Sequence, residues 1–393
     1  IMNDGDFIPE SGELTYRGID IRKLVDGFIC ENRFGYEEIA YLLLLGNLPT
    51  EKELKDFSEL LASYRDLPYR FVKNMIIGLP CQDVMNVISR SVLGLYSYDK
   101  DADDLSIANV LRQSIQLISV MPLLAVYAYQ AHQYYQKKSS LIIHPPDKTL
   151  STAENILKML RPDKKYKEIE AKVLDLALVL HAEHGGGNNS TFTTHVVTSS
   201  GTDTYSTIAS ALASLKGPKH GGANIKVVNM FDDLKENIKH WNDEDEIKSY
   251  LKRIVNKQAF DKKGLIYGMG HAVYRKTDPR TVLFKSFVSE LVKENGLEHE
   301  LELYETVERL TPEVLREEKG IEKEIFANID FYSGFIYRML KIPDELFTPI
   351  FAIARATGWS AHRLEELVNK GKIIRPAYRS VAVKIPYVAL NQR

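Results

Sequence analysis

Apolar residues recur every three or four positions along most of the chain, which is the period of an amphipathic helix. Capping boxes at Thr50-x-x-Glu53 and Ser151-x-x-Glu154 predict where two of these helices start. Further starts are predicted at Thr311-Pro312 and Thr348-Pro349, and further ends at Gly358 and Gly371. The pattern predicts a mainly α protein built from many short helices.

Few segments alternate as strands do. A short hairpin near residues 13–21 and extended segments near the C-terminus are the best candidates. The Thr- and Val-rich run 190–199 is ambiguous between strand and helix. The apolar run 115–129 is too short and too interrupted to cross a bilayer, so we expect a buried core helix.

Charge divides the chain. The stretches 232–263 and 298–323 are dense in Asp, Glu and Lys, and a histidine motif lies between them. We therefore expect a smaller domain at 222–341, inserted into a larger one made of 1–221 and 342–393. Small residues gather at 206–214, which suits either close helix packing or a subunit interface.

The overall composition argues against one class of partner. The 393 residues include 51 basic and 53 acidic side chains, a formal net charge of −2, so bulk attraction to nucleic acid or anionic membranes is absent. Cys30 and Cys81 form neither a disulfide framework nor a metal-binding spacing. We expect a cytoplasmic protein with no nucleic-acid and no membrane partner.

Three histidines lie at glycine-flanked breaks: His184 in HAEHGGGN, His220 in GPKHGGAN and His271 in GMGHAVYRKTDPR. Glycine lets backbone N–H groups approach whatever an imidazole faces. For His184 substrate contact is therefore favoured over core or capping roles, whereas for His220 a water-exposed turn is an equal alternative. His181 and His184 also form an HxxH pair. That pair lacks the zincin spacing, and glycines follow it at once, so a zinc site is the weaker interpretation.

Three arginines and one aspartate occupy unusual positions. Arg280 ends the TDPR motif, Arg355 lies in the apolar helix FAIARATGW, and Arg375 precedes a proline. Together they indicate a substrate with two or more carboxylates, although each alone fits a structural ion pair. Asp330 stands between apolar neighbours, where burial would raise its pKa and suit a base that removes a proton next to a carbonyl. An N-cap role is its alternative.

Taken in order, these motifs resemble the citrate synthase family, which has 2-methylcitrate synthase as a close relative. The resemblance covers nearly the whole chain and rests on YRGIDIRKLV (16–25), YEEIAYLLLLGNLP (36–49), HAEHGGGN, GPKHGGAN, GMGHAVYRKTDPR, NIDFYSG, FAIARATGWSAH and IIRP. It implies a mainly α homodimer in which the small domain closes as a lid over oxaloacetate and an acyl-CoA.

The resemblance also implies roles for residues. Asp330 would remove a methyl proton from acetyl-CoA, His220 would hydrogen-bond its thioester oxygen, and His271 would polarise and protonate the ketone of oxaloacetate. Residues implied to bind oxaloacetate are His184, Asn188, Arg280, Arg355 and Arg375, the last from the partner subunit. Arg275 would face the phosphates of coenzyme A. The implied products are citrate and free coenzyme A, with no metal and no permanently bound cofactor.

Two positions depart from the family's pattern. Gly185 stands where an acidic residue is frequent, and Met269 stands between the glycines where an aromatic or small residue is commoner. The alternative within the family is a 2-methylcitrate synthase that uses propionyl-CoA. Alternatives from other classes are an HxxH metallohydrolase and a catalytically silent helical scaffold.

Overall fold

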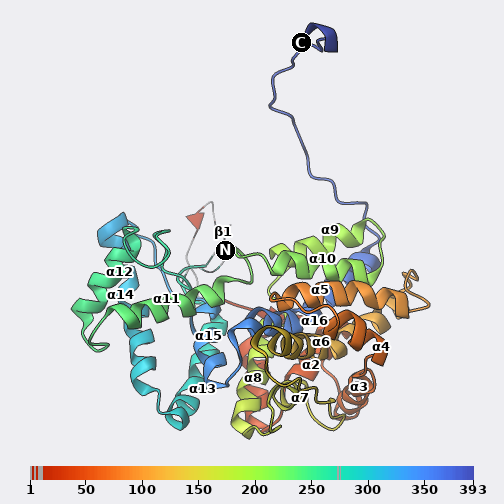
Figure 1. The fold of residues 1–393 in the computed structure, drawn as a ribbon, viewed down its shortest axis with the longest axis horizontal. Helices are drawn as coiled ribbons and strands as arrows, with labels where there is room; N and C mark the ends of the chain where they lie inside the picture. Colours follow the sequence, from red (N-terminus) through yellow and green to blue (C-terminus); the bar gives the residue numbers. More distant parts are fainter. Residues whose placement is uncertain (1, 4–5, 8–11, 272–273, 275) are drawn as a thin grey trace.

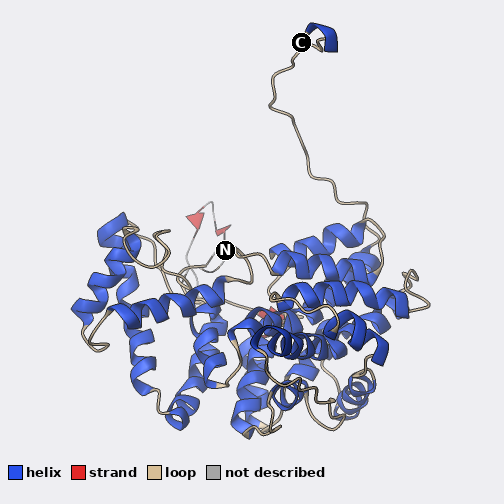
Figure 2. Ribbon diagram, viewed as in Figure 1, coloured by secondary structure: helices blue, strands red, loops and turns tan. Residues whose placement is uncertain are grey.

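The computed structural model describes residues 2–3, 6–7, 12–271, 274 and 276–393, and helices dominate them (Figures 1 and 2). The α-helices in these residues are α1 (Ile21–Cys30), α2 (Tyr36–Leu45), α3 (Glu51–Ser63), α4 (Tyr69–Phe71), α5 (Val84–Leu95), α6 (Ile107–Lys137), α7 (Thr152–Leu160), α8 (Glu168–His181), α9 (Asn189–Ser199), α10 (Thr204–Leu215), α11 (Ala223–Asn237), α12 (Glu244–Val255), α13 (Pro279–Asn295), α14 (Glu298–Lys319), α15 (Ile329–Met339) and α16 (Phe347–Asn369). The shorter helical segments are η1 (Val72–Ile77), η2 (Tyr96–Tyr98), η3 (Asp344–Leu346) and η4 (Leu390–Gln392). Two antiparallel strand pairs complete the description: β1 (Met2–Asn3) with β2 (Asp6–Phe7), and β3 (Thr15–Tyr16) with β4 (Ile19–Asp20). The prediction of a mainly α fold is confirmed.

Helix α6 is a core helix. Its stretch 115–129 is almost entirely buried, as predicted, and Pro122 lies within it without ending it. By length and composition α6 would also suit a membrane span, but 83% of its most apolar window is buried inside the protein. Packing against α5, α7 and α16 provides this burial.

Helix α16 runs through the larger group of helices and packs against α2, α6, α8 and α9. Its Trp359 and Arg363 are fully buried. The Arg363 guanidinium donates to the hydroxyls of Thr198 (3.2 Å) and Thr207 (2.8 Å) and to the carbonyl of Thr202 (2.8 Å). Because a buried cation without such partners would be costly, these bonds fix α16 against α9 and α10.

The predicted hairpin near residues 13–21 is confirmed as β3 and β4, and it holds the end of α8. The Tyr16 hydroxyl is buried and lies 2.9 Å from the carbonyl of Val179 and 3.2 Å from that of Glu183. It therefore satisfies carbonyls that the last turn of a helix leaves without partners. This fixes the point at which the chain leaves α8 toward His184.

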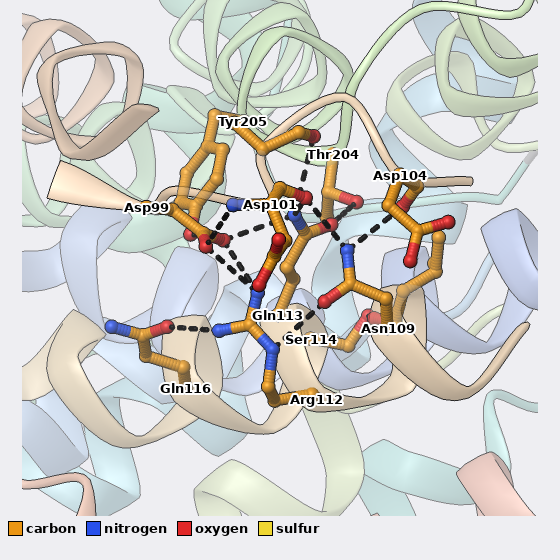
Figure 3. A network of polar contacts seen from close by, with 12 residues as sticks. Asp99, Asp101, Asp104, Asn109, Arg112, Gln113, Ser114, Gln116, Thr204 and Tyr205 are labelled. Carbon is orange, nitrogen blue, oxygen red and sulfur yellow. Dashed lines mark hydrogen bonds and ion pairs between the residues drawn. The ribbon is translucent and has the colours of Figure 1, made fainter. Parts of the chain in front are cut away.

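A polar network joins the turn at 99–104 to α6 and α10 (Figure 3). Arg112 binds the Asp99 carboxylate with two hydrogen bonds of 2.9 and 2.7 Å. The same carboxylate accepts from the Tyr205 hydroxyl (2.7 Å) and the Gln113 amide (3.0 Å). Since one carboxylate serves three side chains, the network ties two helices through a single turn.

Helices α11 to α15 lie together on the left of Figure 1 and pack largely on one another. They fall within 222–341, the range predicted for the inserted domain, and contact the other helices mainly through α13 and α11. That this range is a separate closing domain stays a prediction.

One local start signal is wrong. Thr311-Pro312 lies inside α14 instead of starting a helix. The Thr311 hydroxyl is buried and donates to the carbonyl of Val307 (2.6 Å), one turn back. The packing of α14 against α12 therefore outweighs the local signal for a helix start.

The predicted signals at Gly358, Thr348 and Gly371 do not coincide with the helix boundaries in the structure. Gly358 lies within α16 and does not end it. That helix begins at Phe347, one residue before the predicted cap Thr348, and it is ended by left-handed Lys370 (φ 49°) just before Gly371.

The two uncertain segments also resolve. The ambiguous run 190–199 is helical, in α9. The C-terminal strand candidates are wrong, because residues 371–389 form no strand and extend away from α9 and α10 (Figure 1).

We predict that Gly334→Ala destabilises the fold. A Cβ at Gly334 of α15 would overlap the side chain of Val228 and lie 2.9 Å from Asn224 Oδ1. Overpacking of this kind costs about 1–3 kcal/mol in the free energy of unfolding. The matched control is Gly27→Ala in α1, where nothing lies within 4 Å of the added atom and a gain of about 0.4–1 kcal/mol is expected. Chemical denaturation measures both, and equal stabilities would contradict the prediction.

Candidate active site

His184 and His271 meet between the two groups of helices, with their Nε2 atoms 3.2 Å apart. The backbone N–H of Tyr274 donates to His271 Nδ1 (3.0 Å), so a neutral His271 carries its proton on Nε2. That proton points to His184 Nε2, which places the His184 proton on Nδ1. The Nδ1 atom is buried and has no partner among the described residues. Burial lowers the pKa of both histidines, so both are neutral donors.

Glycines bring His271 beside the start of α15. Gly268 and Gly270 have φ angles of 78° and 84°, which favour glycine. Asn328 reaches both, since its N–H donates to the carbonyl of Gly268 (2.9 Å) and its side-chain amide to that of Gly270 (2.8 Å). Asn328 thereby holds the loop that carries His271, and Asn328 itself lies two positions before Asp330 in the chain. Met269 takes part in the same pairing through its backbone.

Asp330 lies in the first turn of α15. Asn328 caps this helix and accepts from the Asp330 N–H (3.0 Å), so the N-cap alternative for Asp330 is wrong. The Asp330 carboxylate makes no hydrogen bond to another described residue, and burial raises its pKa to about 6, against the opposing charges of Arg280 and Arg355. It has the strength of a base that works near neutral pH.

His220 lies on the turn before α11. Its Nε2 is 3.0 Å from the Ser190 hydroxyl, which also accepts from the indole N–H of Trp359 (3.1 Å). Ser190 lies 2.9 Å from Asn188 Oδ1, so Asn188 contacts the partner of His220. Burial lowers the pKa of His220 to about 4, so this histidine is also neutral.

Arg355 is buried in α16 with most of its donors unused. Its Nε donates to the carbonyl of His181 (2.8 Å), and its guanidinium lies 4.7 Å from the centre of the Phe351 ring. Nη1 and Nη2 are buried and have no partner among the described residues. A guanidinium left in this state calls for a bidentate anion such as a carboxylate.

Arg280 differs from Arg355. It forms the structural ion pair considered as its alternative, donating through Nε (3.0 Å) and Nη2 (2.7 Å) to the buried Asp278, which also caps α13. Any carboxylate that Arg280 binds must therefore share it with Asp278.

The remaining two predicted arginines are not seen to contribute to the site among the described residues. Arg375 lies exposed beyond α16, and Arg275 lies outside the described residues.

The two histidines of the HxxH pair diverge. His181 Nδ1 lies 2.8 Å from the carbonyl of Ala177, one turn back, whereas His184 faces His271. In the described ranges no three His, Cys, Asp or Glu side chains are grouped to hold a metal ion. The zinc interpretation gains no support from this geometry.

Sequence reasoning missed Ser190, Trp359 and Tyr274. Ser190 and Trp359 act through contacts with residues from other segments, and Tyr274 acts on His271 through its backbone N–H, so their residue types carry no chemical signal. Ser190 follows the HAEHGGGN motif closely, which is the one cue that pointed to it.

Comparisons with known proteins give a consistent result. A family model described as "Citrate synthase, C-terminal domain" matches residues 5–377. The citrate synthase of Haloferax volcanii is 35% identical over 99% of this chain and 94% of its own length, and that of Synechocystis sp. is 33% identical over 97% and 88%. The 2-methylcitrate synthase 2 of Corynebacterium glutamicum is 31% identical over 94% and 88%.

Solved structures agree. Citrate synthase from Pyrobaculum aerophilum superposes with a TM-score of 0.78 at 31% identity, covering 97% of this chain and 90% of that one. The ternary complex of the Thermoplasma acidophilum enzyme with carboxymethyl coenzyme A and oxaloacetate gives a TM-score of 0.80 at 26% identity, covering 98% and 95%.

We predict that His220 makes the fold sensitive to acid. In an unfolded chain histidine binds a proton near pH 6.5, whereas burial lowers the pKa of His220 to about 4. Between these values the unfolded state gains a proton that the folded state does not, so stability falls as pH falls. The free energy of unfolding of His220→Gln should therefore depend less on pH from 6.5 to 4 than that of the wild type. The exposed His299 supplies the control His299→Gln, and identical slopes in the two variants would contradict the prediction.

Proposed function

Because this chain belongs to the citrate synthase family, it is an enzyme of citrate synthase type, and we propose that its acyl donor is acetyl-CoA. It condenses the acyl-CoA with oxaloacetate and water to give citrate and free coenzyme A. The observation that carries the condensation chemistry is a half-buried carboxylate with a pKa raised to about 6, set among neutral histidines and a buried arginine whose terminal nitrogens have no partner among the described residues.

The oxaloacetate half-site is formed by Arg355, His184 and Arg280. The two free Nη groups of Arg355 would hold one carboxylate in bidentate geometry, and the His184 Nδ1–H would donate to the same substrate. Arg280 would hold the second carboxylate with the donors that Asp278 leaves free. Asn188 would assist only through Ser190.

The acyl half-site is formed by Asp330 and His220. Asp330 would remove a proton from the acyl methyl while His220 donates a hydrogen bond to the thioester oxygen. In the empty protein the one hydroxyl proton of Ser190 is donated to Asn188 Oδ1 (2.9 Å). For His220 to donate through Nδ1, that proton must turn to His220 Nε2 when the acyl-CoA binds. A neutral donor of this kind stabilises the developing enolate.

Condensation then follows with atoms in balance. The enolate carbon forms a bond to the ketone carbon of oxaloacetate as the C=O π bond breaks, and the ketone oxygen takes the proton of His271 Nε2. The methyl proton held by Asp330 balances this loss, and its return to His271 through water restores both groups before the next turnover. Water next attacks the citryl thioester, the C–S bond breaks, and citrate and the thiol of coenzyme A leave. Since the site is divided between two groups of helices, we propose that 222–341 closes over the substrates and excludes bulk water.

We further propose a homodimer in which Arg375 reaches the partner's site. In this chain Arg375 lies outside its own site, on a C-terminal segment that exposes large apolar side chains such as Tyr378 and Val381. The neighbouring α9 exposes Phe192, and the small residues of α10 border it. A second copy would cover these surfaces. Arg275 facing the coenzyme A phosphates, the absence of a required metal and a cytoplasmic location belong to the same proposal.

Propionyl-CoA is the second candidate donor, because one relative is a 2-methylcitrate synthase. One methylene changes the activation free energy by only about 1–3 kcal/mol. Comparison of kcat/KM for the two acyl-CoA substrates decides between them.

We predict that Asp330→Asn abolishes thiol release from acetyl-CoA in the presence of oxaloacetate, by about 100-fold or more, because the base is lost. In the wild type, kcat/KM should rise as pH passes about 6, where the Asp330 carboxyl ionises. The exposed Asp56 on α3 supplies the control Asp56→Asn, with activity within about twofold of wild type. Wild-type protein that releases no thiol from either acyl-CoA would overturn the function, and normal turnover by Asp330→Asn would overturn only the assigned base.

We predict that Arg375→Ala and His271→Ala are each nearly inactive but complement each other. After mixed refolding about half of the dimers carry one chain of each kind, and each mixed dimer has one intact site. About a quarter of the wild-type activity should return. Verified mixed dimers without activity would show that Arg375 does not act across subunits.

A further inference from the structure

A second pair of histidines, His195 and His362, is linked by hydrogen bonds to Glu183, the residue before His184. Together with two carboxylates they form a continuous hydrogen-bonded chain, here called the imidazole chain, whose members from the outer end inward are Glu366, His195, His362 and Glu183. Its successive contacts are 2.7, 3.0 and 3.0 Å long. It links α9, α16 and the turn after α8.

Counting protons shows that every nitrogen of the pair is used. Each ionised carboxylate must receive one N–H, and the contact between the imidazoles needs a third. Two neutral imidazoles supply only two, so all three contacts are hydrogen-bonded at once only when the chain holds a third proton. A chain satisfied at all three contacts is stiff, because moving one member breaks its neighbours' bonds.

The inner end of the chain holds the turn that carries His184. Glu183 Oε1, which accepts from His362, also accepts the backbone N–H of Gly185. The side chain of Glu183 is thus bonded to the backbone of Gly185, so the residues before and after His184 are held to each other. Gly185 has a φ of 83°, which glycine adopts without strain. Glycine therefore suits this turn, at a position where the family often has an acidic residue.

Helix α16 presents three residues of one face to this turn, at i, i+3 and i+7. Arg355 donates to the carbonyl of His181, and His362 binds Glu183. Gly358 lies between them, and a Cβ there would overlap the carbonyl of Ala182. One helix thus sets both the arginine and the histidine of the oxaloacetate half-site.

We propose that the imidazole chain positions His184 for oxaloacetate, with His362 as the residue through which α16 sets the turn. None of the four members is a catalytic residue, because they act through the Gly185 N–H and the backbone of His184. The proposal rests on the proposed function for the identity of the ligand. It also links the two half-sites, since α9 carries both His195 and the Ser190 that binds His220.

Two substitutions of one residue test the proposal. The amide nitrogen of glutamine reaches the place of His362 Nε2 and keeps the bond to Glu183, whereas that of asparagine reaches only the place of Nδ1. We expect His362→Asn to raise the oxaloacetate KM by about tenfold with the acyl-CoA KM within about twofold, and His362→Gln to restore most of the loss. His132→Asn is the control, because the His132 side chain is also largely buried (8% exposed, against 16% for His362) and lies 3.9 Å from Glu345, away from the site. His195→Phe removes the bonds of His195 to Glu366 and to His362 but keeps the bond between His362 and Glu183, so it should give an intermediate KM.

Hydrogen exchange of the 182–188 backbone, measured without substrate, is the second readout. Exchange should rise in His362→Asn and stay near the wild-type rate in His362→Gln and His132→Asn. Equal exchange and equal KM in the two His362 variants would overturn the positioning role. Failure of the wild type to release thiol would overturn the proposed function instead, and the exchange result would still decide the positioning role.

Discussion

The guanidinium of Arg355 is the constraint around which this site is arranged. It lies fully buried in a central helix and is bonded through one nitrogen to the end of α8. Its two terminal nitrogens have no partner within the described part of the chain. A charge in this state is unfavourable for folding. The surrounding helices must therefore be stable enough to hold it, and the well-packed α6 and the satisfied Arg363 on the same α16 meet that need. Binding of an anion to Arg355 would supply the missing hydrogen bonds and remove this unfavourable contribution to the folding free energy.

The electrostatics of the site follow from the same burial. Low polarity around the histidines removes their charge, and it weakens the acidity of Asp330. Neutral donors and a moderately basic carboxylate are what proton transfer next to a carbonyl requires. Burial thus lowers the pKa of His184 and of His220 and raises the pKa of Asp330.

Much of this could be predicted from the sequence. Helical periodicity and the capping boxes at Thr50 and Ser151 predicted fold class and two helix starts correctly, because those signals are local. Gly358 was wrongly predicted to end a helix, because glycine is needed there for close contact with the turn after α8. Thr311-Pro312 was wrongly predicted to start a helix, because packing keeps it inside α14.

The site divides in the same way. Glycine-flanked histidines could be recognised along the chain, whereas the partners that fix their tautomers could not. The serine beside His220 and the carboxylate beside Gly185 have meaning only in three dimensions.

The contact between His184 and His271 has one more consequence. In the empty protein each imidazole occupies a hydrogen-bonding position of the other, across two different groups of helices. An arriving keto acid must exchange places with this internal pair, so its measured affinity is the difference between two sets of bonds. The contact between the two histidines therefore acts as an internal competitor of the substrate.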